Sequence, residues 1–112
     1  MEIIMHLDKE PFNKIKSGKK TIECRLNDEK RRNIKVGDTI KFGLSGKDKE
    51  ITCEVTNLYT FNSFEELYNN IPKEKLGYDE DDIASPADMN VYYSSDRQLK
   101  YGVVGIEIKV IK

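Results

Sequence analysis

The residues best suited to chemistry lie in one short segment, SGKKTIECRLND, which covers residues 17–28. Its glycine predicts a turn, where the backbone can approach a ligand closely. Lysine supplies a point charge for phosphate, arginine a planar fork for phosphate or a base edge, and glutamate an acceptor for an exocyclic amine. Lys20, Glu23 and Arg25 could therefore hold a nucleotide. The alternative is an exposed strand with an ion pair that contributes little stability.

Alternation of polar and apolar residues predicts that residues 19–26 form a β-strand. Ile22 and Cys24 would share the face that fills the core. The opposite, polar face would carry the alternate residues Lys19, Thr21, Glu23 and Arg25. Glu23 and Arg25 are close enough on that face to pair. Lys20 lies outside this alternation, at the entry of the strand, where a turn or bulge can redirect it.

A second group combines aromatic and basic side chains near the end of the chain: Tyr92, Tyr93, Tyr101, Arg97 and Lys100. Aromatic rings can stack on nucleobases while basic groups hold the phosphates. The alternative is that one tyrosine packs in the core and the others are ordinary surface residues. Because Tyr92 and Tyr93 are adjacent in a predicted helix, we expect them to face different sides.

The sequence predicts no metal site and no cofactor. It contains one histidine, and its two cysteines lie in separate segments without a CxxC spacing. It has neither a GxxxxGK[ST] nor a GxGxxG phosphate-binding motif. Reduced thiols, the lack of an apolar run of about 20 residues and the lack of a basic leader favour a cytoplasmic protein with no membrane segment.

Charge is distributed unevenly along the chain. Residues 14–35 carry nine basic and three acidic side chains, a net charge of +6. Residues 65–96 carry nine acidic and two basic side chains, a net charge of −7. The whole chain has a formal charge of −1, so it is no polycation. This asymmetry predicts a basic face for a phosphate-bearing partner, although lysine-rich surfaces are also common without such a role.

The positions of strands and helices predict an α+β protein. We expect strands over residues 2–7, 19–26, 39–44, 51–61 and 100–111. Helices are expected over residues 8–18, from Ser63 to Pro72, and from Ser85 onward. The 112 residues suit one domain, covering residues 1–112. Short connections favour mixed or antiparallel pairing in a small curved sheet or partial barrel with helices at its rims.

The run FNKIKSGKKTIECRLND, followed by IKVGDTIKF, resembles the ASCH domain family of the PUA-like superfamily. The ending MNVYYSSDRQLKYGVVGIEIKV also resembles the end of these proteins, so the likeness covers nearly the whole chain. It suggests a small, single-domain bacterial or archaeal member. The resemblance implies a PUA-like fold, a small mixed β-barrel flanked by helices, with a cleft beside the GKKT strand. It also implies RNA, a nucleotide or a nucleoside as the ligand. The binding residues would be Lys19, Lys20, Thr21, Glu23, Arg25 and Tyr93.

The same family includes enzymes. Small bacterial members hydrolyse N4-acetylcytidine with a lysine, a threonine nucleophile and a glutamate, and other members have been linked to RNA cleavage. The lysine corresponds to Lys20, whereas the position of the threonine is occupied by Glu23. A carboxylate does not simply replace a hydroxyl nucleophile. The resemblance therefore favours binding. The alternative is a hydrolase, either an amidohydrolase or a ribonuclease, with Lys20 and Glu23 as the catalytic pair.

Overall fold

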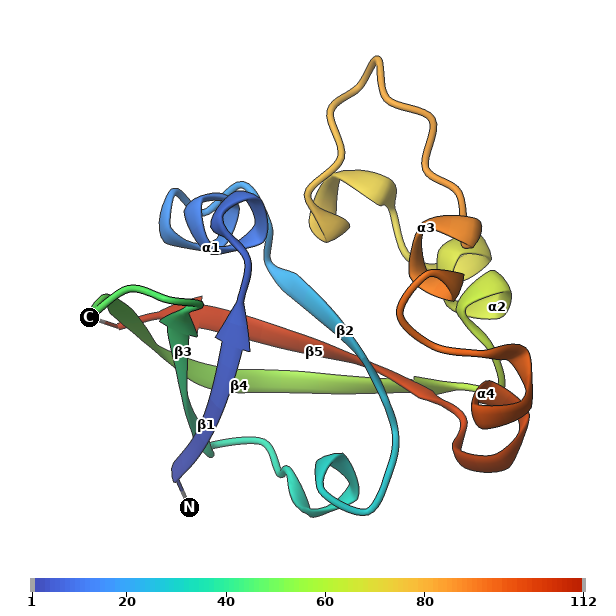
Figure 1. Ribbon diagram of the computed structural model, residues 1–112, viewed down its shortest axis with the longest axis horizontal. Helices are drawn as coiled ribbons and strands as arrows, with labels where there is room; N and C mark the ends of the chain where they lie inside the picture. The colour runs from blue at the N-terminus through green and yellow to red at the C-terminus, as the bar shows by residue number, and fades with distance from the viewer. Residues whose placement is uncertain (1, 112) are drawn as a thin grey trace.

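Five strands form one sheet that curls into a half-barrel (Figure 1). The computed structural model describes residues 2–111. The strands are β1 (Glu2–Leu7), β2 (Ile22–Leu26), β3 (Thr39–Leu44), β4 (Glu50–Phe61) and β5 (Val103–Val110), in the order β1-β3-β4-β5-β2. β1 runs parallel to β3, and the other neighbours are antiparallel, so the predicted mixed sheet is confirmed. Because β1 and β2 end the order, the barrel is open between them.

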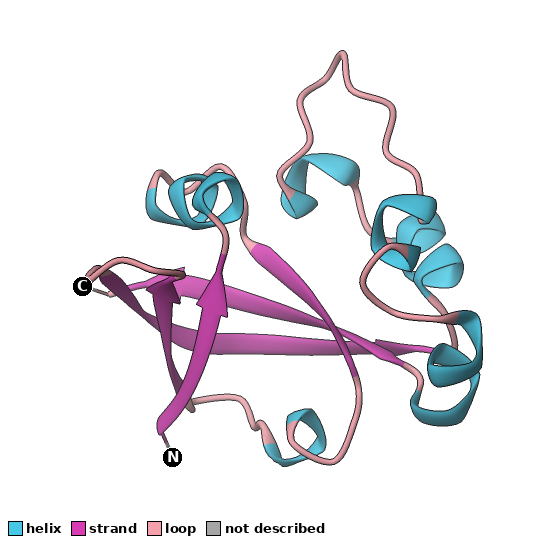
Figure 2. Cartoon of the chain, viewed as in Figure 1, coloured by secondary structure: helices cyan, strands magenta, loops and turns pink. Residues whose placement is uncertain are grey.

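Helices cover two sides of this sheet (Figure 2). Within residues 2–111 they are α1 (Lys9–Lys16), α2 (Phe64–Asn70), α3 (Ala87–Asn90) and α4 (Ser95–Tyr101), with 3-10 turns at Arg31–Asn33 and Lys73–Leu76. α1 follows β1 directly, whereas α2, α3 and α4 gather on the other side of β2 (Figure 1). None of the described helices has the length and apolar character needed to cross a lipid bilayer.

A side-chain cap accounts for the start of α2 but not for the start of α1. The hydroxyl of Ser63 accepts the backbone N–H of Glu66 at 3.1 Å, so α2 begins at the predicted cap. α1 begins after Asp8, whose backbone is extended but whose side chain makes no capping hydrogen bond. Phe12 and Ile15 then lie on the buried face of α1, three residues apart as expected.

The last third of the chain differs from the prediction. In place of one helix continuing from residue 85 there are two short helices, and the final strand begins at Val103 instead of residue 100. The physical reason is a second helix cap. The Ser94 hydroxyl accepts the backbone N–H of Arg97 at 3.3 Å, which starts α4 within the segment expected to lead into the strand. α4 ends at Gly102, whose φ of +73° favours glycine.

Two apolar cores lie on the two faces of the sheet. The inner core, enclosed by the half-barrel and α1, contains Met5, Leu7, Phe12, Ile15, Ile34, Ile40, Phe42, Ile51, Cys53, Val55, Val104, Ile106 and Ile108. The outer core, between the sheet and the later helices, contains Ile22, Cys24, Leu26, Phe64, Leu67, Ile71, Leu76 and Val103. Residues of β5 alternate between the two cores, as the period of a strand requires.

β2 buries both of its faces, which the alternating pattern did not reveal. Its apolar residues pack in the outer core as predicted. Glu23 pairs in register with Ile106 of β5, and Arg25 pairs with Val104. Paired residues of antiparallel strands share a face, so Glu23 and Arg25 are directed toward the inner core. The expectation that one face of β2 would fill the core was therefore incomplete, because the half-barrel encloses the opposite, polar face as well.

Candidate functional site

A cavity of about 330 Å³ lies beside β2, where the half-barrel is open. Residues 6–8 at the end of β1 and residues of α1 line one side. Lys20, Glu23, Cys24 and Arg25 contribute the residues of β2 and its entry, and the later helices contribute the opposite wall. Its volume falls within the range of about 300–1,000 Å³ that is typical of small-molecule sites.

An ion cluster contributes the charged part of this lining. The ammonium of Lys20 lies 2.8 Å from Oε1 of Glu23. Nη2 and Nε of Arg25 lie 2.8 Å and 2.9 Å from Oε2 of the same carboxylate. The Glu23 side chain is only 7% exposed, and those of Lys20 and Arg25 are 14% exposed. The expected pairing of Glu23 with Arg25 is present, and Lys20 joins it from outside the alternation.

Opposite charge keeps Lys20 and Glu23 of this cluster ionised. Burial by itself would raise the pKa of Glu23, but Lys20 and Arg25 outweigh it and the pKa is lowered. Burial would likewise lower the pKa of Lys20, but the Glu23 carboxylate outweighs it and the pKa is raised. Lys20 is therefore a hydrogen-bond donor at neutral pH and cannot accept a proton, while the Glu23 carboxylate has both oxygens occupied.

Arg25 also connects the two open edges of the sheet. Its Nη2 donates a hydrogen bond of 3.1 Å to the backbone oxygen of His6 in β1. These contacts use Nε and Nη2, so the Nη1 donors have no partner recorded among the described residues. The imidazole of His6 packs against Gly43, where an added Cβ would lie 3.2 Å from the ring. His6 thus contributes its carbonyl to the site and packs its ring against β3.

Tyrosines form much of the wall opposite α1. Tyr92 and Tyr93 lie in the turn after α3, which ends at Asn90, and not in a helix as expected. They still face different surroundings, because Tyr93 stacks on Phe64 with ring centroids 5.6 Å apart whereas Tyr92 is 65% exposed. Both rings belong to residues that line the cavity. Tyr101, in contrast, is absent from the lining, and its backbone oxygen accepts a hydrogen bond from Arg32 at 3.3 Å.

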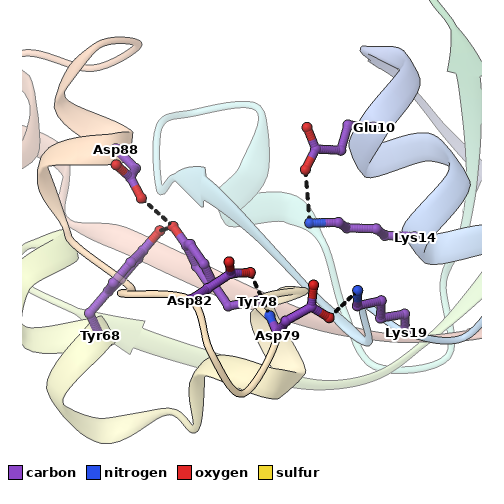
Figure 3. Close-up of polar contacts among 8 residues, drawn as sticks. All are labelled: Glu10, Lys14, Lys19, Tyr68, Tyr78, Asp79, Asp82 and Asp88. Carbon is purple, nitrogen blue, oxygen red and sulfur yellow. Dashed lines mark hydrogen bonds and ion pairs between the residues drawn. The ribbon is translucent and has the colours of Figure 1, made fainter.

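Two further tyrosines in the wall were missed by the sequence analysis. The Tyr68 and Tyr78 hydroxyls lie 2.9 Å apart, and Tyr78 donates to Asp88 at 2.8 Å (Figure 3). Burial raises the pKa of both phenols, so they are neutral hydrogen-bonding groups at physiological pH. No local motif marks them, because they approach β2 only through the packing of α2 and the turn after it.

The remaining predicted site residues lie outside this cavity. Lys19 forms an ion pair with Asp79, immediately before the cavity residue Lys20 in the chain (Figure 3). The backbone N–H of Thr21 donates to Lys75, and its carbonyl accepts from Ile108. Thr21 instead lines a second hollow, of about 310 Å³, between the end of α1 and the end of β5. Of the six predicted residues, the cavity therefore gathers Lys20, Glu23, Arg25 and Tyr93.

Several basic residues of the segment 14–35 form two groups, near opposite ends of β2. Lys14 and Lys20 lie at the cavity, at the α1 end of β2. Arg31 pairs with Asp28 at 3.0 Å beyond the other end of β2, where the chain makes a 3-10 turn (Figure 1). Arg32 donates to two backbone oxygens there. The second group thus stabilises the connection to β3.

The described residues offer little support for a cysteine nucleophile or a metal site. Burial raises the pKa of the Cys24 thiol to about 12, so this cavity residue is a protonated thiol at neutral pH and a poor nucleophile. No three His, Cys, Asp or Glu side chains within residues 2–111 are grouped so as to hold a metal ion. The cavity instead combines fixed cationic donors with aromatic surfaces, which suits recognition of a planar ligand that carries acceptors.

Comparison with known proteins gives a family match and several similar structures. The family model of the ASCH domain matches residues 5–112. The crystal structure of the hypothetical protein PH0355 is 36% identical, with a TM-score of 0.83, and the match covers 99% of this chain and 100% of that one. The solution structure of protein PF0455 from Pyrococcus furiosus is 37% identical, with a TM-score of 0.71 and coverage of 100% and 99%.

More distant structures share the fold. An ASCH protein from Zymomonas mobilis is 16% identical, with a TM-score of 0.65, and the match covers 96% of this chain and 66% of that one. At this identity the likeness concerns the fold alone. It agrees with the α+β half-barrel flanked by helices that the PUA-like resemblance implied. No match was found among curated proteins.

Proposed function

The chain belongs to the ASCH domain family, and we propose that it binds RNA or a nucleotide with one base in the cavity beside β2. One observation carries the proposal: the buried cluster of Lys20, Glu23 and Arg25 borders an open cavity. Breaking such a cluster is costly, but its net contribution to stability is small compared with an apolar equivalent. Perturbed ionisable groups in a cleft are instead typical of functional sites.

The cluster would orient donors toward the ligand. Glu23 holds Lys20 and Arg25 in place, which reduces the entropy lost when they bind a second partner. An ammonium has three N–H groups, so Lys20 retains donors for a phosphate or a base carbonyl beyond the one directed at Glu23. The free Nη1 side of Arg25 can contact a base edge.

Aromatic residues would hold the base itself. Tyr92 is largely exposed beside the cavity, and one face of Tyr93 is already supported by Phe64. Stacking of a base on an aromatic side chain is worth about 1–3 kcal/mol and is tolerant of base identity. Lys14 and Lys19, which flank Lys20 in space or sequence, would then face the sugar-phosphate chain outside the cavity.

RNA binding that weakens with salt is the expected result for the wild-type protein. We would titrate a fluorescently labelled, single-stranded RNA of about 8 nucleotides, within the usual site sizes, at several salt concentrations. The logarithm of the association constant should fall linearly with that of the salt concentration, with a slope of about −2 for three phosphate contacts. An affinity that is independent of salt, or no binding at low salt, would contradict the proposal.

A hydrolase remains the second candidate, favoured by the 2.8 Å contact between a lysine and a carboxylate at the cavity. The directions of the two pKa shifts favour binding instead, because neither group is placed to take a proton at neutral pH. The test is to incubate the protein with N4-acetylcytidine and with short RNAs and to analyse the products by mass spectrometry. No product, or the same product from Lys20→Met, would reject an enzyme that uses this pair.

A further inference from the structure

An acidic loop, residues 79–82, lies next to the lysines at the cavity. Its sequence is Asp-Glu-Asp-Asp, and its first carboxylate forms the ion pair with Lys19 (Figure 3). The loop follows Tyr78, whose side chain belongs to the cavity wall. Negative charge is therefore placed where the proposed function requires the phosphates of a nucleic acid to pass.

Several contacts hold this loop in position. Lys73 donates from its ammonium to the backbone oxygens of Glu80 and Asp82. The carboxylate of Asp82 accepts the backbone N–H of Asp79 at 2.7 Å (Figure 3). The loop carboxylate that contacts Lys19 is thus presented by an ordered turn.

Gly77, two residues before the loop, packs directly on the aliphatic parts of two lysine side chains. Gly77 has a φ of +97°, and a Cβ there would lie 3.2 Å from Cβ of Lys20 and 3.3 Å from Cδ of Lys14. Only glycine combines that backbone conformation with so close an approach. The loop is consequently anchored against the same basic residues that border the cavity.

We propose that Asp79 is an intramolecular competitor for phosphate, which holds Lys19 until a nucleic-acid phosphate replaces it. This inference rests on the proposed function. A carboxylate and a phosphate oxygen accept the same hydrogen bonds from an ammonium. The side chains of Lys19 and Asp79 are 40% and 60% exposed, so the pair contributes little stability and can exchange readily.

Lys14 of α1 likewise forms an ion pair with an exposed carboxylate. Its ammonium lies 2.9 Å from Glu10, which is 78% exposed (Figure 3). In the unliganded protein, Lys14 and Lys19 are therefore each paired with a solvent-exposed carboxylate. The apparent association constant of a phosphate for such a lysine is the intrinsic constant multiplied by the fraction of time that the lysine is unoccupied. Asp79 would thereby favour ligands whose several phosphates can compete with it over isolated anions.

The experiment compares Asp79→Asn with Asp81→Asn, using the labelled RNA described above. Both changes remove one negative charge from the same loop, but no ion pair of Asp81 is recorded among the described residues. We expect Asp79→Asn to tighten RNA binding about three- to tenfold. Asp81→Asn should tighten it less than about twofold, through the general field alone.

A double-mutant cycle with Lys19→Met separates a specific contact from a general charge effect. If Asp79 acts on Lys19, the gain from Asp79→Asn should fall to that of Asp81→Asn once Lys19 is replaced. Equal gains from Asp79→Asn and Asp81→Asn in the wild-type background, or a full gain from Asp79→Asn in the Lys19→Met background, would overturn this inference while the wild-type binding upholds the proposed function. Absence of RNA binding in all variants would overturn both.

Discussion

Replacing Glu23 with glutamine is expected to lower the free energy of unfolding at pH 7 by about 3 kcal/mol. The change leaves Lys20 and Arg25 as two cations, each only 14% exposed, without their shared carboxylate. Removing one partner of a buried ion pair costs more than the pair itself contributes, because the remaining charge keeps its desolvation cost. Urea unfolding followed by far-ultraviolet circular dichroism would measure the difference.

The pH dependence of this loss has a definite sign. The folded-state pKa of Glu23 is lowered from its ordinary value, so its contribution is fully present above the unfolded pKa of about 4.3. That contribution is lost as the pH falls through the folded pKa. The wild-type advantage over Glu23→Gln should therefore be constant from about pH 6 to 8 and shrink below about pH 4.

Glu50→Gln provides the matched control for this experiment. Glu50 is an exposed strand residue at the start of β4, and its substitution should change the free energy of unfolding by less than about 0.5 kcal/mol. If Glu23→Gln lowered the free energy of unfolding no more than this control does, the prediction that Glu23 stabilises the folded protein through the buried ion cluster would be wrong.

The triple variant Lys20→Met, Glu23→Leu and Arg25→Met is expected to lose RNA binding but to remain folded. This is the second large effect that we expect. Replacing a whole buried ion cluster with apolar side chains of similar size is often neutral or stabilising. The variant should therefore unfold within about 2 kcal/mol of the wild type. Its RNA affinity should fall at least about tenfold, because each lost polar contact is worth about 1–3 kcal/mol.

The control for the triple variant is Lys47→Met. The triple change lowers the net charge by one, as does the removal of this exposed lysine in the turn between β3 and β4. Lys47→Met should weaken RNA binding by less than about twofold through the general field. Equal RNA affinities of the triple variant and Lys47→Met would contradict the proposal that RNA binds in the cavity, even if the protein still binds RNA elsewhere.

Local patterns in the sequence were sufficient for most of the fold. The helix cap at Ser63, the alternation along β2 and the apolar spacing of α1 each depend on residues a few positions apart. The family resemblance added the PUA-like architecture to the order of elements that these patterns predicted. The main local error, at α4, came from overlooking the cap at Ser94.

The predicted site was only partly decided by such patterns. The pairing of Glu23 with Arg25 was anticipated, because the two residues alternate on one strand face. The contact of Lys20 with Glu23 was not, because Lys20 lies outside that alternation. The separation of Thr21 from them could not, because it depends on how the turn before β2 packs against Lys75 and β5. Lys19 faces Asp79 for a similar reason, since that contact joins residues sixty positions apart in the sequence.

From the sequence it follows that a charged strand comes after a glycine turn and that Glu23 and Arg25 of this strand can pair. Only the tertiary structure decided that this strand is covered on both faces, that Tyr68 and Tyr78 complete a wall beside it, and that Asp79 occupies Lys19. The physical reason is that strand alternation and helix caps are short-range, whereas burial, cavity walls and competing charges arise from elements that meet only after the chain has folded.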